Sequence, residues 1–395
     1  MKTLLKKAIE AIRSLEKRYA TKPREAINVT VEVGDFEENT GFSEIDYRSI
    51  GVKHIDISSV KRNTFIYGLD SSSRVVDTPY SFIAVGASTV LNRFNGFTID
   101  YPDINDIYGE ESKRFFTLFI PEFEAGDEEL DVLENMNIVT KNPAGYRYKP
   151  GYNKSIALDE FRLMLENALL REVLVRDCFK DATLLLDGPL YIVPQYVNIG
   201  LKEMGNEVVK AYIDAWITLV SERLNILEKL FVEKNVISIG VVKRINKSNI
   251  LSKTDPLGIS KSCLNDYTYL STYIERTSRT LNVKPLSIGP LIYRQTILEK
   301  TLPLKKAIYI AVPKTLYSGG YRSYCFFRIE SFEYVGEEEI LNPILYDSVL
   351  TGTTMPLTIL IADNRVKKIT SCLVNYTKAI LEYPVETTLQ YISIS

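Results

Sequence analysis

The chain has 395 residues, of which 45% are hydrophobic and 25% are charged, a composition typical of a soluble globular protein. The formal charge of −2 excludes a protein that coats nucleic acid through a global positive field, but not an enzyme whose basic residues act locally. The amino terminus lacks the apolar core of a signal peptide, and no apolar run reaches the roughly 18 residues that span a bilayer. We therefore expect a cytoplasmic protein with no membrane segment.

The cysteines and the histidine exclude several classes of site. Cys178, Cys263, Cys325 and Cys372 lie far apart, with no CxxC spacing. Zinc-ribbon and redox motifs are therefore excluded, and we expect buried free thiols. The single histidine, His54, cannot anchor a multi-histidine metal site, and we expect it to be structural and to lie in a strand.

The first predicted element is an amphipathic helix over residues 3–19. Its apolar side chains recur on one face among Lys, Arg and Glu, and they are Leu5, Ile9, Ile12 and Leu15. This helix either packs on its own domain or contacts a second subunit or another partner. We divide the chain into an N-terminal helical region, 1–23, and a main domain, 24–395.

Apolar runs then predict an alternation of strands and helices. Strands are expected near 27–34, 53–60, 63–70 and 79–86. The stretch 100–155 is acidic, rich in tyrosine and broken by prolines, and we interpret it as an insertion or long connection. The elements expected after it are a helix over 156–178, a strand over 182–191, a helix over 205–233, a strand over 236–242 and a last helix near 364–383. Continuous apolar strands are typical of sheets covered on both faces, so we predict a mixed α/β fold.

The segment GLDSSSR, residues 68–74, places a carboxylate and three hydroxyls directly after an apolar strand. A hairpin turn explains Asp70, because aspartate and serine are common turn residues. However, Asp187 stands in the same position in LLLDGPL, residues 184–190. Two such carboxylates on neighbouring strands would meet at one rim of the sheet and could hold a divalent cation, which prefers oxygen ligands. The sequence leaves both the turn and the metal site open.

The helix between these strands adds a third candidate. Glu166 is flanked by leucines in LMLENALL, where an unpaired buried carboxylate would be costly. It therefore emerges at the edge of the apolar face or binds something. Glu172 is the alternative on the same helix, and a salt bridge explains it adequately.

The order of these segments resembles the NurA nuclease family, which has an RNase H-like core and works with the HerA DNA translocase. The resemblance spans nearly the whole chain from residue 60 onward. It is carried by GLDSSSR, the LENAL helix, LLLDGPL, VISIGVVKR at 236–244, FFRIESFEYV at 326–335 and MPLTILIADNRVKKI at 355–369. It implies an RNase H-like mixed sheet flanked by helices, with an N-terminal helix and insertions.

The resemblance also implies roles for single residues. Asp70 and Asp187 match the family's two metal-binding aspartates, and Glu166 is the best match for its helical glutamate, with Glu172 as the alternative. The last segment departs from the pattern, because the family's tyrosine falls on Met355 and its histidine on Asp363. Since an aspartate can still bind Mn²⁺ or Mg²⁺, Asp363 either completes a catalytic metal site of four carboxylates, with Asp70, Glu166 and Asp187, or marks a loss of activity.

Two basic residues are candidates for contact with DNA. Lys243, in GVVKR, matches a family lysine and either approaches a phosphate or is a solvated charge at the end of a strand. Arg74 either contacts the DNA backbone or pairs with an acidic neighbour. Arg328 and Glu330, in FFRIE, are expected to form a structural pair.

The function implied by the resemblance is that of a metal-dependent DNA nuclease, a 5′-to-3′ exonuclease and single-strand endonuclease that favours Mn²⁺. Two metal ions can activate water and stabilise the phosphate charge without a histidine, and they reverse the local negative sign. The resemblance further implies a homodimer docked on a hexameric HerA ATPase and a role in DNA end resection and double-strand break repair. The alternative is a NurA-like adaptor that binds DNA or HerA with little or no cleavage.

Overall fold

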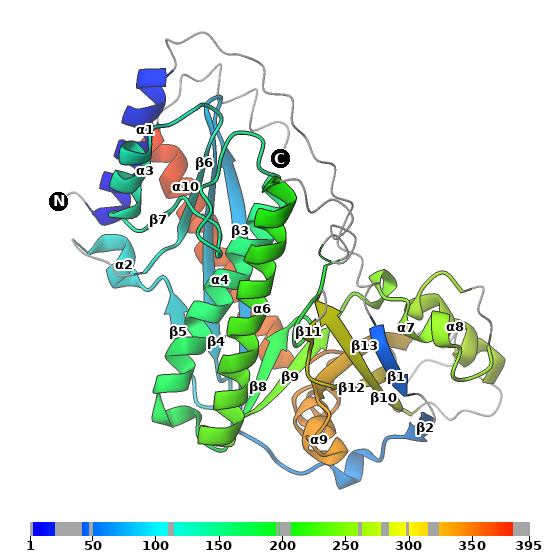
Figure 1. Ribbon diagram of the computed structural model, residues 1–395. Coiled ribbons are helices and arrows are strands. Elements are labelled where there is room, and N and C mark those ends of the chain that lie inside the picture. The colour runs from blue at the N-terminus through cyan, green and yellow to red at the C-terminus, as the bar shows by residue number, and fades with distance from the viewer. Residues whose placement is uncertain are drawn as a thin grey trace.

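The computed structural model describes residues 3–19, 42–46, 50–109, 114–194, 197, 207–259, 263–277, 284–297, 300–314 and 324–381. Within these ranges, 13 strands form one mixed sheet, and long helices cover both of its faces (Figure 1). The predicted mixed α/β fold is therefore confirmed. The predicted strand near 27–34 lies outside the described residues.

Five neighbouring strands form the part of the sheet that positions the site. They are β3 (Ile66–Asp77), β4 (Ser81–Leu91), β6 (Thr117–Pro121), β8 (Thr183–Asp187) and β9 (Ile237–Val242). Their order in the sheet is β6-β4-β3-β8-β9. In the order β6-β4-β3 each strand is antiparallel to its neighbour, whereas β8 and β9 run parallel to β3. Three antiparallel strands followed by two parallel ones make the RNase H-like core that we expected.

The sheet continues beyond this core on both sides. After β9 come β13 (Tyr324–Phe332), β12 (Lys305–Pro313), β10 (Leu286–Ile297) and β1 (Phe42–Asp46). Four short strands complete the sheet. Both β2 (Gly51–His54) and β11 (Lys300–Thr301) pair with β10. On the other side, β5 (Thr98–Tyr101) pairs with β4, and β7 (Ile138–Val139) pairs with β6. The stretch 100–155 thus supplies β6, the third strand of the core.

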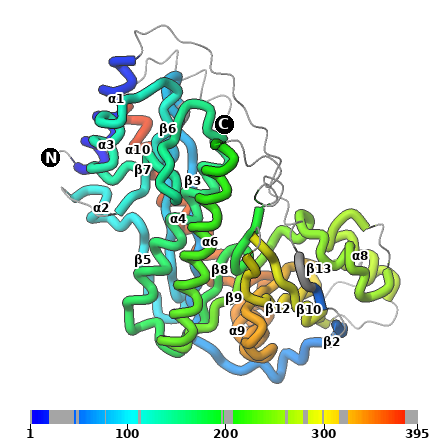
Figure 2. The backbone as a smooth tube through the Cα atoms, viewed as in Figure 1, coloured from blue at the N-terminus to red at the C-terminus, as the bar shows by residue number. Residues whose placement is uncertain are grey.

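The long helices are α4 (Lys154–Val175), α6 (Glu207–Lys234) and α10 (Leu357–Leu381). Figure 1 shows α4 and α6 in front of the sheet and α10 behind it. The short helices are α2 (Ile104–Tyr108), α3 (Asp127–Glu134), α7 (Ile250–Thr254), α8 (Asp266–Thr277) and α9 (Glu337–Asp347), with 3₁₀ turns η1 (Ile57–Ser59), η2 (Asp177–Phe179), η4 (Ile245–Lys247) and η5 (Val349–Thr351). Figure 2 shows α2 and α3 at one end of the molecule and α8 at the other.

The N-terminal helix α1 (Leu4–Tyr19) packs on its own domain. The apolar stripe of Leu5, Ile9, Ile12 and Leu15 is at most 2% exposed, in a cluster with side chains of β4 and α10. Glu16 is buried as well, and its carboxylate accepts hydrogen bonds from the hydroxyls of Thr78 and Ser81. Of the two roles left open by the sequence, packing within the chain therefore accounts for the apolar stripe.

Two element boundaries near the candidate site differ from the predictions. Strand β3 does not end at Asp70 but continues through the serines to Asp77, paired along β4, so the hairpin-turn interpretation is wrong. Helix α10 begins at Leu357 rather than at residue 364. Its first turn, LTIL, is an apolar run that periodicity cannot distinguish from a strand. Farther away, the strand predicted over 53–60 is only β2, followed by η1.

The free thiols are not buried as expected. Cys178 and Cys372 are exposed, and Cys263 and Cys325 are half-buried. The single histidine, His54, ends β2 and is exposed. Among the helices in the described ranges, none is long and apolar enough to cross a membrane.

A buried carboxyl group on α4 leads to a prediction about pH. Glu160 is fully buried and accepts hydrogen bonds from Tyr148 and Tyr152, at 3.0 and 2.8 Å. Burial raises the pKa of Glu160 from 4.5 to about 8. Between these values the folded chain keeps a proton that the unfolded chain has lost, so Glu160 makes the free energy of unfolding fall as pH rises, by at most about 1.4 kcal/mol per pH unit.

Glu160→Gln should therefore flatten the dependence of the free energy of unfolding on pH between about 4.5 and 8. The measurement is urea denaturation of both proteins across this range, with the exposed Glu128→Gln as the control. Equal slopes for wild type and Glu160→Gln would show that Glu160 titrates alike in the folded and unfolded chains.

Candidate metal centre

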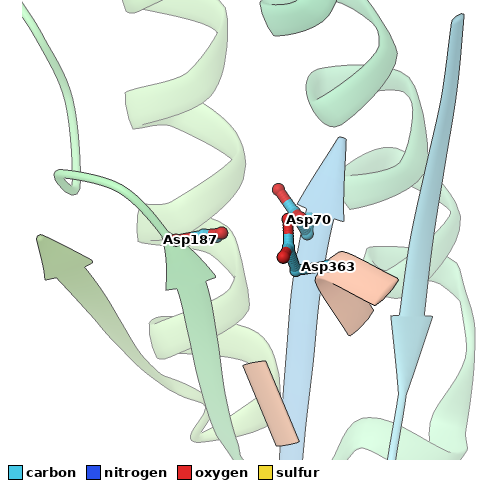
Figure 3. Close-up of side chains that lie close together, drawn as sticks. All are labelled: Asp70, Asp187 and Asp363. Atoms are coloured by element: carbon cyan, nitrogen blue, oxygen red, sulfur yellow. The ribbon is translucent and has the colours of Figure 1, made fainter. Parts of the chain in front are cut away.

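Three aspartates from three different elements meet beside β3 and β8 (Figure 3). Asp70 lies in β3, Asp187 is the last residue of β8, and Asp363 lies inside α10. One carboxylate oxygen from each residue lies within 4.8 Å of those of the other two. Parallel pairing sets Leu69 opposite Leu186, which brings the next residues, Asp70 and Asp187, to the same level. The prediction that these two strands are neighbours is therefore confirmed.

The third aspartate reaches the cluster because α10 packs closely on β3. A Cβ atom at Gly68 would lie 3.0 Å from the Thr358 side chain and 3.1 Å from its backbone, so the glycine allows this close approach. The buried Asp347 accepts hydrogen bonds from the backbone N–H and hydroxyl of Thr358, at 2.8 and 3.0 Å. Arg93 Nε donates to the same carboxylate at 2.5 Å. These contacts fix the start of the helix that carries Asp363.

The electrostatics of the three carboxylates match a site for a cation. Burial raises the pKa of Asp70 to about 8, and the charges of Asp187 and Glu166 add to the effect. Burial also raises the pKa of Asp187, although Lys243 opposes this shift. For Asp363, burial would raise the pKa, but hydrogen bonding to Lys367 and the charge of Lys243 lower it. A divalent cation would favour the ionised form of all three groups, and their donor set of carboxylate oxygens suits Mn²⁺ or Mg²⁺.

Of the two predicted DNA contacts, only Lys243 lies at the centre. Lys243 directly follows the last residue of β9, and its Nζ donates a hydrogen bond to Asp187 Oδ2 at 2.6 Å. Arg74 lies farther along β3, opposite Val85 of β4, and is exposed. Lys243 therefore carries positive charge to the edge of the cluster, whereas Arg74 does not line the cleft around it.

The predicted glutamate, Glu166, lies next to the three aspartates but outside their cluster. Its two carboxylate oxygens accept hydrogen bonds from Ser71 Oγ at 2.6 Å and from Arg223 Nη1 at 2.7 Å. The alternative, Glu172, instead forms an ion pair with Arg114 at 2.7 Å. Of the two glutamates on α4, it is thus Glu166 that adjoins the site.

Arg223 is a residue that the sequence analysis missed. It is only 3% exposed, and besides Glu166 it binds the carbonyl oxygen of Leu190, to which Nε donates at 2.9 Å. Leu190 follows closely after Asp187, so Arg223 connects α4 to the segment after β8. Its only signal in the sequence is an arginine among the apolar residues of a long helix, which does not reveal the partner.

A cleft of about 710 Å³ opens over the aspartates. Its lining includes Ser71, Ser72 and Ser73, the three residues that follow Asp70 in β3. The lining also includes one further acidic residue, Asp159, and five basic residues, which are Arg162, Lys243, Arg244, Lys247 and Lys367. A cleft that contains both an acidic cluster and basic side chains can bind cations at the carboxylates and phosphate groups at the basic residues.

Comparisons with known proteins agree with the family resemblance of the sequence. The family model for the NurA domain matches residues 65–368. The chain is similar to the NurA nuclease from Sulfolobus solfataricus, with 13% identity, a TM-score of 0.40 and coverage of 86% of this chain and 91% of that one. It is also similar to NurA bound to dAMP and manganese, with 11% identity, a TM-score of 0.38 and coverage of 78% and 87%.

A further crystal structure, NurA with manganese, is 10% identical, with a TM-score of 0.36 and coverage of 79% of this chain and 88% of that one. No curated protein matches the chain. The family model spans the chain from the first strand of the core to the middle of α10, and includes all three clustered aspartates. The protein therefore belongs to the NurA family.

Proposed function

We propose that the protein is a metal-dependent DNA nuclease whose metal ligands are Asp70, Asp187 and Asp363. The observation that carries the proposal is the convergence of these three carboxylates in a cleft whose lining also carries five basic side chains. Membership in the NurA family supports it. The proposed cofactor is Mn²⁺ or Mg²⁺, and we propose that two ions bind.

Divalent ions bound at such carboxylates supply an activated water and stabilise negative charge on the phosphate and the leaving oxygen. Other residues of the chain bind the DNA and keep the metal ligands in position. Lys243 and the other basic residues of the cleft draw the DNA backbone toward the acidic centre and orient it. Arg223 holds Glu166, and Glu166 holds the Ser71 hydroxyl, so that the backbone beside Asp70 keeps its position.

The finer parts of the function rest on the family alone. We propose 5′-to-3′ exonuclease and single-strand endonuclease activity, in the cytoplasm, during DNA end resection and double-strand break repair. We also propose a homodimer that docks on a HerA-type hexameric ATPase. Any contact through α1 would have to use its charged face, because its apolar face is covered by the chain itself. Arg74 is proposed as a contact to DNA outside the cleft.

The test is to incubate the purified protein with labelled single-stranded DNA and Mn²⁺, with and without EDTA. Cleavage in Mn²⁺ that EDTA abolishes is the expected result, because EDTA removes the ions from the aspartates. DNA binding without cleavage in Mn²⁺ or Mg²⁺ would reject the nuclease and favour the adaptor function.

Glu166→Gln should lower the rate of cleavage by about 10- to 100-fold. This is the usual loss when a residue that orients the metal ligands, without binding the metal itself, is replaced. The control is Glu172→Gln on the same helix, which should cut at close to the wild-type rate because Glu172 pairs with Arg114. Single-turnover cleavage rates in saturating Mn²⁺ compare the variants. A larger loss for Glu172→Gln than for Glu166→Gln would reverse the assignment.

A further inference from the structure

A second, smaller cavity adjoins the cleft of the metal centre. It has a volume of about 380 Å³ and shares Lys243 and Arg244 with the larger cleft. Its remaining lining residues come from η4, α8 and the segments around the end of β12 and the start of β13, and they are Ile245, Asn246, Tyr267, Lys314, Tyr324, Cys325 and Phe326. The two cavities therefore meet at Lys243 and Arg244.

Three aromatic rings stand along this cavity. Tyr324 and Phe326 lie two residues apart on β13, with nearly parallel rings whose centroids are 6.3 Å apart. Tyr267, from α8, stands edge-on to Phe326 at 5.6 Å. The two β13 rings are almost fully buried, whereas Tyr267 is 44% exposed. Tyr267 thus presents a partly exposed ring that packs perpendicular to the buried ring of Phe326, and an exposed aromatic ring can stack on a flat ligand.

The charge of the cavity differs from that of the metal centre. Lys243, Arg244 and Lys314 line it, and none of the described residues in its lining is acidic. An aromatic surface flanked by cations is the combination that binds single-stranded nucleic acid, because bases stack on the rings while the cations bind phosphates. In a duplex the bases are stacked on one another and offer no free face to Tyr267.

We propose that this cavity binds the nucleobase of a nucleotide in single-stranded DNA that neighbours the nucleotide held at the metal centre. Lys243 and Arg244 contact the phosphate between the two nucleotides, and the base stacks on Tyr267. The inference rests on the proposed function, since it takes DNA as the substrate of the adjoining centre. It adds a subsite that selects unpaired DNA.

The test measures binding without cleavage. The full chain, in EDTA, is titrated into a fluorescein-labelled oligodeoxythymidylate and into an abasic oligomer of the same length, and fluorescence anisotropy gives the two dissociation constants. Tyr267→Ala should weaken binding of the oligodeoxythymidylate by about 5- to 150-fold, the effect of losing one stacked base. Binding of the abasic oligomer should stay unchanged, and Tyr267→Trp should bind both oligomers as the wild type does.

The matched control is Tyr108→Ala, which removes an exposed tyrosine on α2. In a second measurement on the wild type, an oligomer with 5-iododeoxyuridine should form a photo-cross-link to the peptide that contains Tyr267 or Phe326. Any of three results would overturn the inference. Tyr267→Ala binds the oligodeoxythymidylate as tightly as the wild type does, or it loses equal affinity for both oligomers, or the cross-links fall only in other peptides. Because EDTA prevents cleavage, a protein that binds in this way but never cuts in Mn²⁺ would refute the proposed nuclease and not the subsite.

Discussion

Asp70→Asn should reduce Mn²⁺-dependent cleavage of single-stranded DNA by about a thousandfold or more. The substitution removes a buried anionic oxygen from the cluster of three carboxylates. Bound metal ions stabilise the transition state by several kcal/mol. Each loss of about 1.36 kcal/mol lowers the rate tenfold. The measurement is the single-turnover rate of cleavage in saturating Mn²⁺. Asp177→Asn, at an exposed aspartate in η2, is the control and should cut at the wild-type rate.

The same assay should give a comparable loss for Asp363→Asn. Because Asp363 lies inside α10 and not at its first residue, a role as helix cap does not explain this aspartate. Asp363→His should retain Mn²⁺-dependent cleavage, since imidazole suits Mn²⁺ better than Mg²⁺. Both variants should remain folded, because each removes a negative charge from a crowded cluster. Near-wild-type cleavage by Asp363→Asn would leave Asp70 and Asp187 as the only aspartates that bind the ions.

Glu330→Gln should lower the free energy of unfolding by about 3–5 kcal/mol at neutral pH. Glu330 is fully buried on β13, where Lys305 Nζ lies 3.0 Å and Arg328 Nη2 lies 2.7 Å from its carboxylate oxygens. The expected structural pair of Arg328 and Glu330 is thus confirmed, with Lys305 as an unforeseen third member. Removing the negative charge takes away the carboxylate that both buried cations share, and removing one partner of a buried ion pair is strongly destabilising.

Urea denaturation measures this effect, with the exposed Glu333→Gln as the control on the same chain segment. Burial alone would raise the pKa of Glu330, but the charges of Lys305 and Arg328 lower it. Its contribution to stability is therefore present above the unfolded pKa and is lost as pH falls through the folded one. The difference between wild type and Glu330→Gln should shrink in strong acid. A difference below about 1 kcal/mol at pH 7 would show that the triad contributes little net stability.

The triad also bears on the site. Glu330 Oε2 accepts a hydrogen bond from the backbone N–H of Leu190, at 3.2 Å. The carbonyl oxygen of Leu190 is bound by Arg223, so the segment that follows Asp187 is held from two sides by buried charged groups. Glu330→Gln should consequently lower cleavage as well as stability, and addition of Mn²⁺ should not restore the lost stability in full.

The pairing of Asp70 with Asp187 could be predicted because it follows from a pattern repeated along the chain. Each aspartate comes after an apolar run, and the parallel pairing of the two strands brings both positions to the same level of the sheet. The path of the chain after Asp70 could not be predicted. The serines read as turn residues, but they continue the strand in its pairing with β4, and Thr370 Oγ1 of α10 donates to the carbonyl oxygen of Ser72. Local propensity gives way here to packing between segments that are 298 positions apart.

The sequence likewise does not reveal which residues the charged side chains pair with. Glu166 stood out because a carboxylate among leucines needs a partner, but that partner, Arg223, lies on the next long helix, 57 positions away. The sequence predicts that Lys243 either approaches a phosphate or is a solvated charge at the end of a strand, but its hydrogen bond to Asp187 depends on the parallel register of β8 and β9. Such contacts follow from the topology of the sheet, which composition and spacing alone do not specify.

The most direct test of the metal centre is an anomalous-scattering experiment on crystals of the full chain soaked in Mn²⁺, with data collected at the manganese absorption edge. The account predicts an anomalous peak between the carboxylates of Asp70, Asp187 and Asp363, with a second peak if two ions bind. The Asp70→Asn protein should lose that density under the same conditions. Crystals of the wild type with manganese bound elsewhere, and none among these three aspartates, would contradict the account.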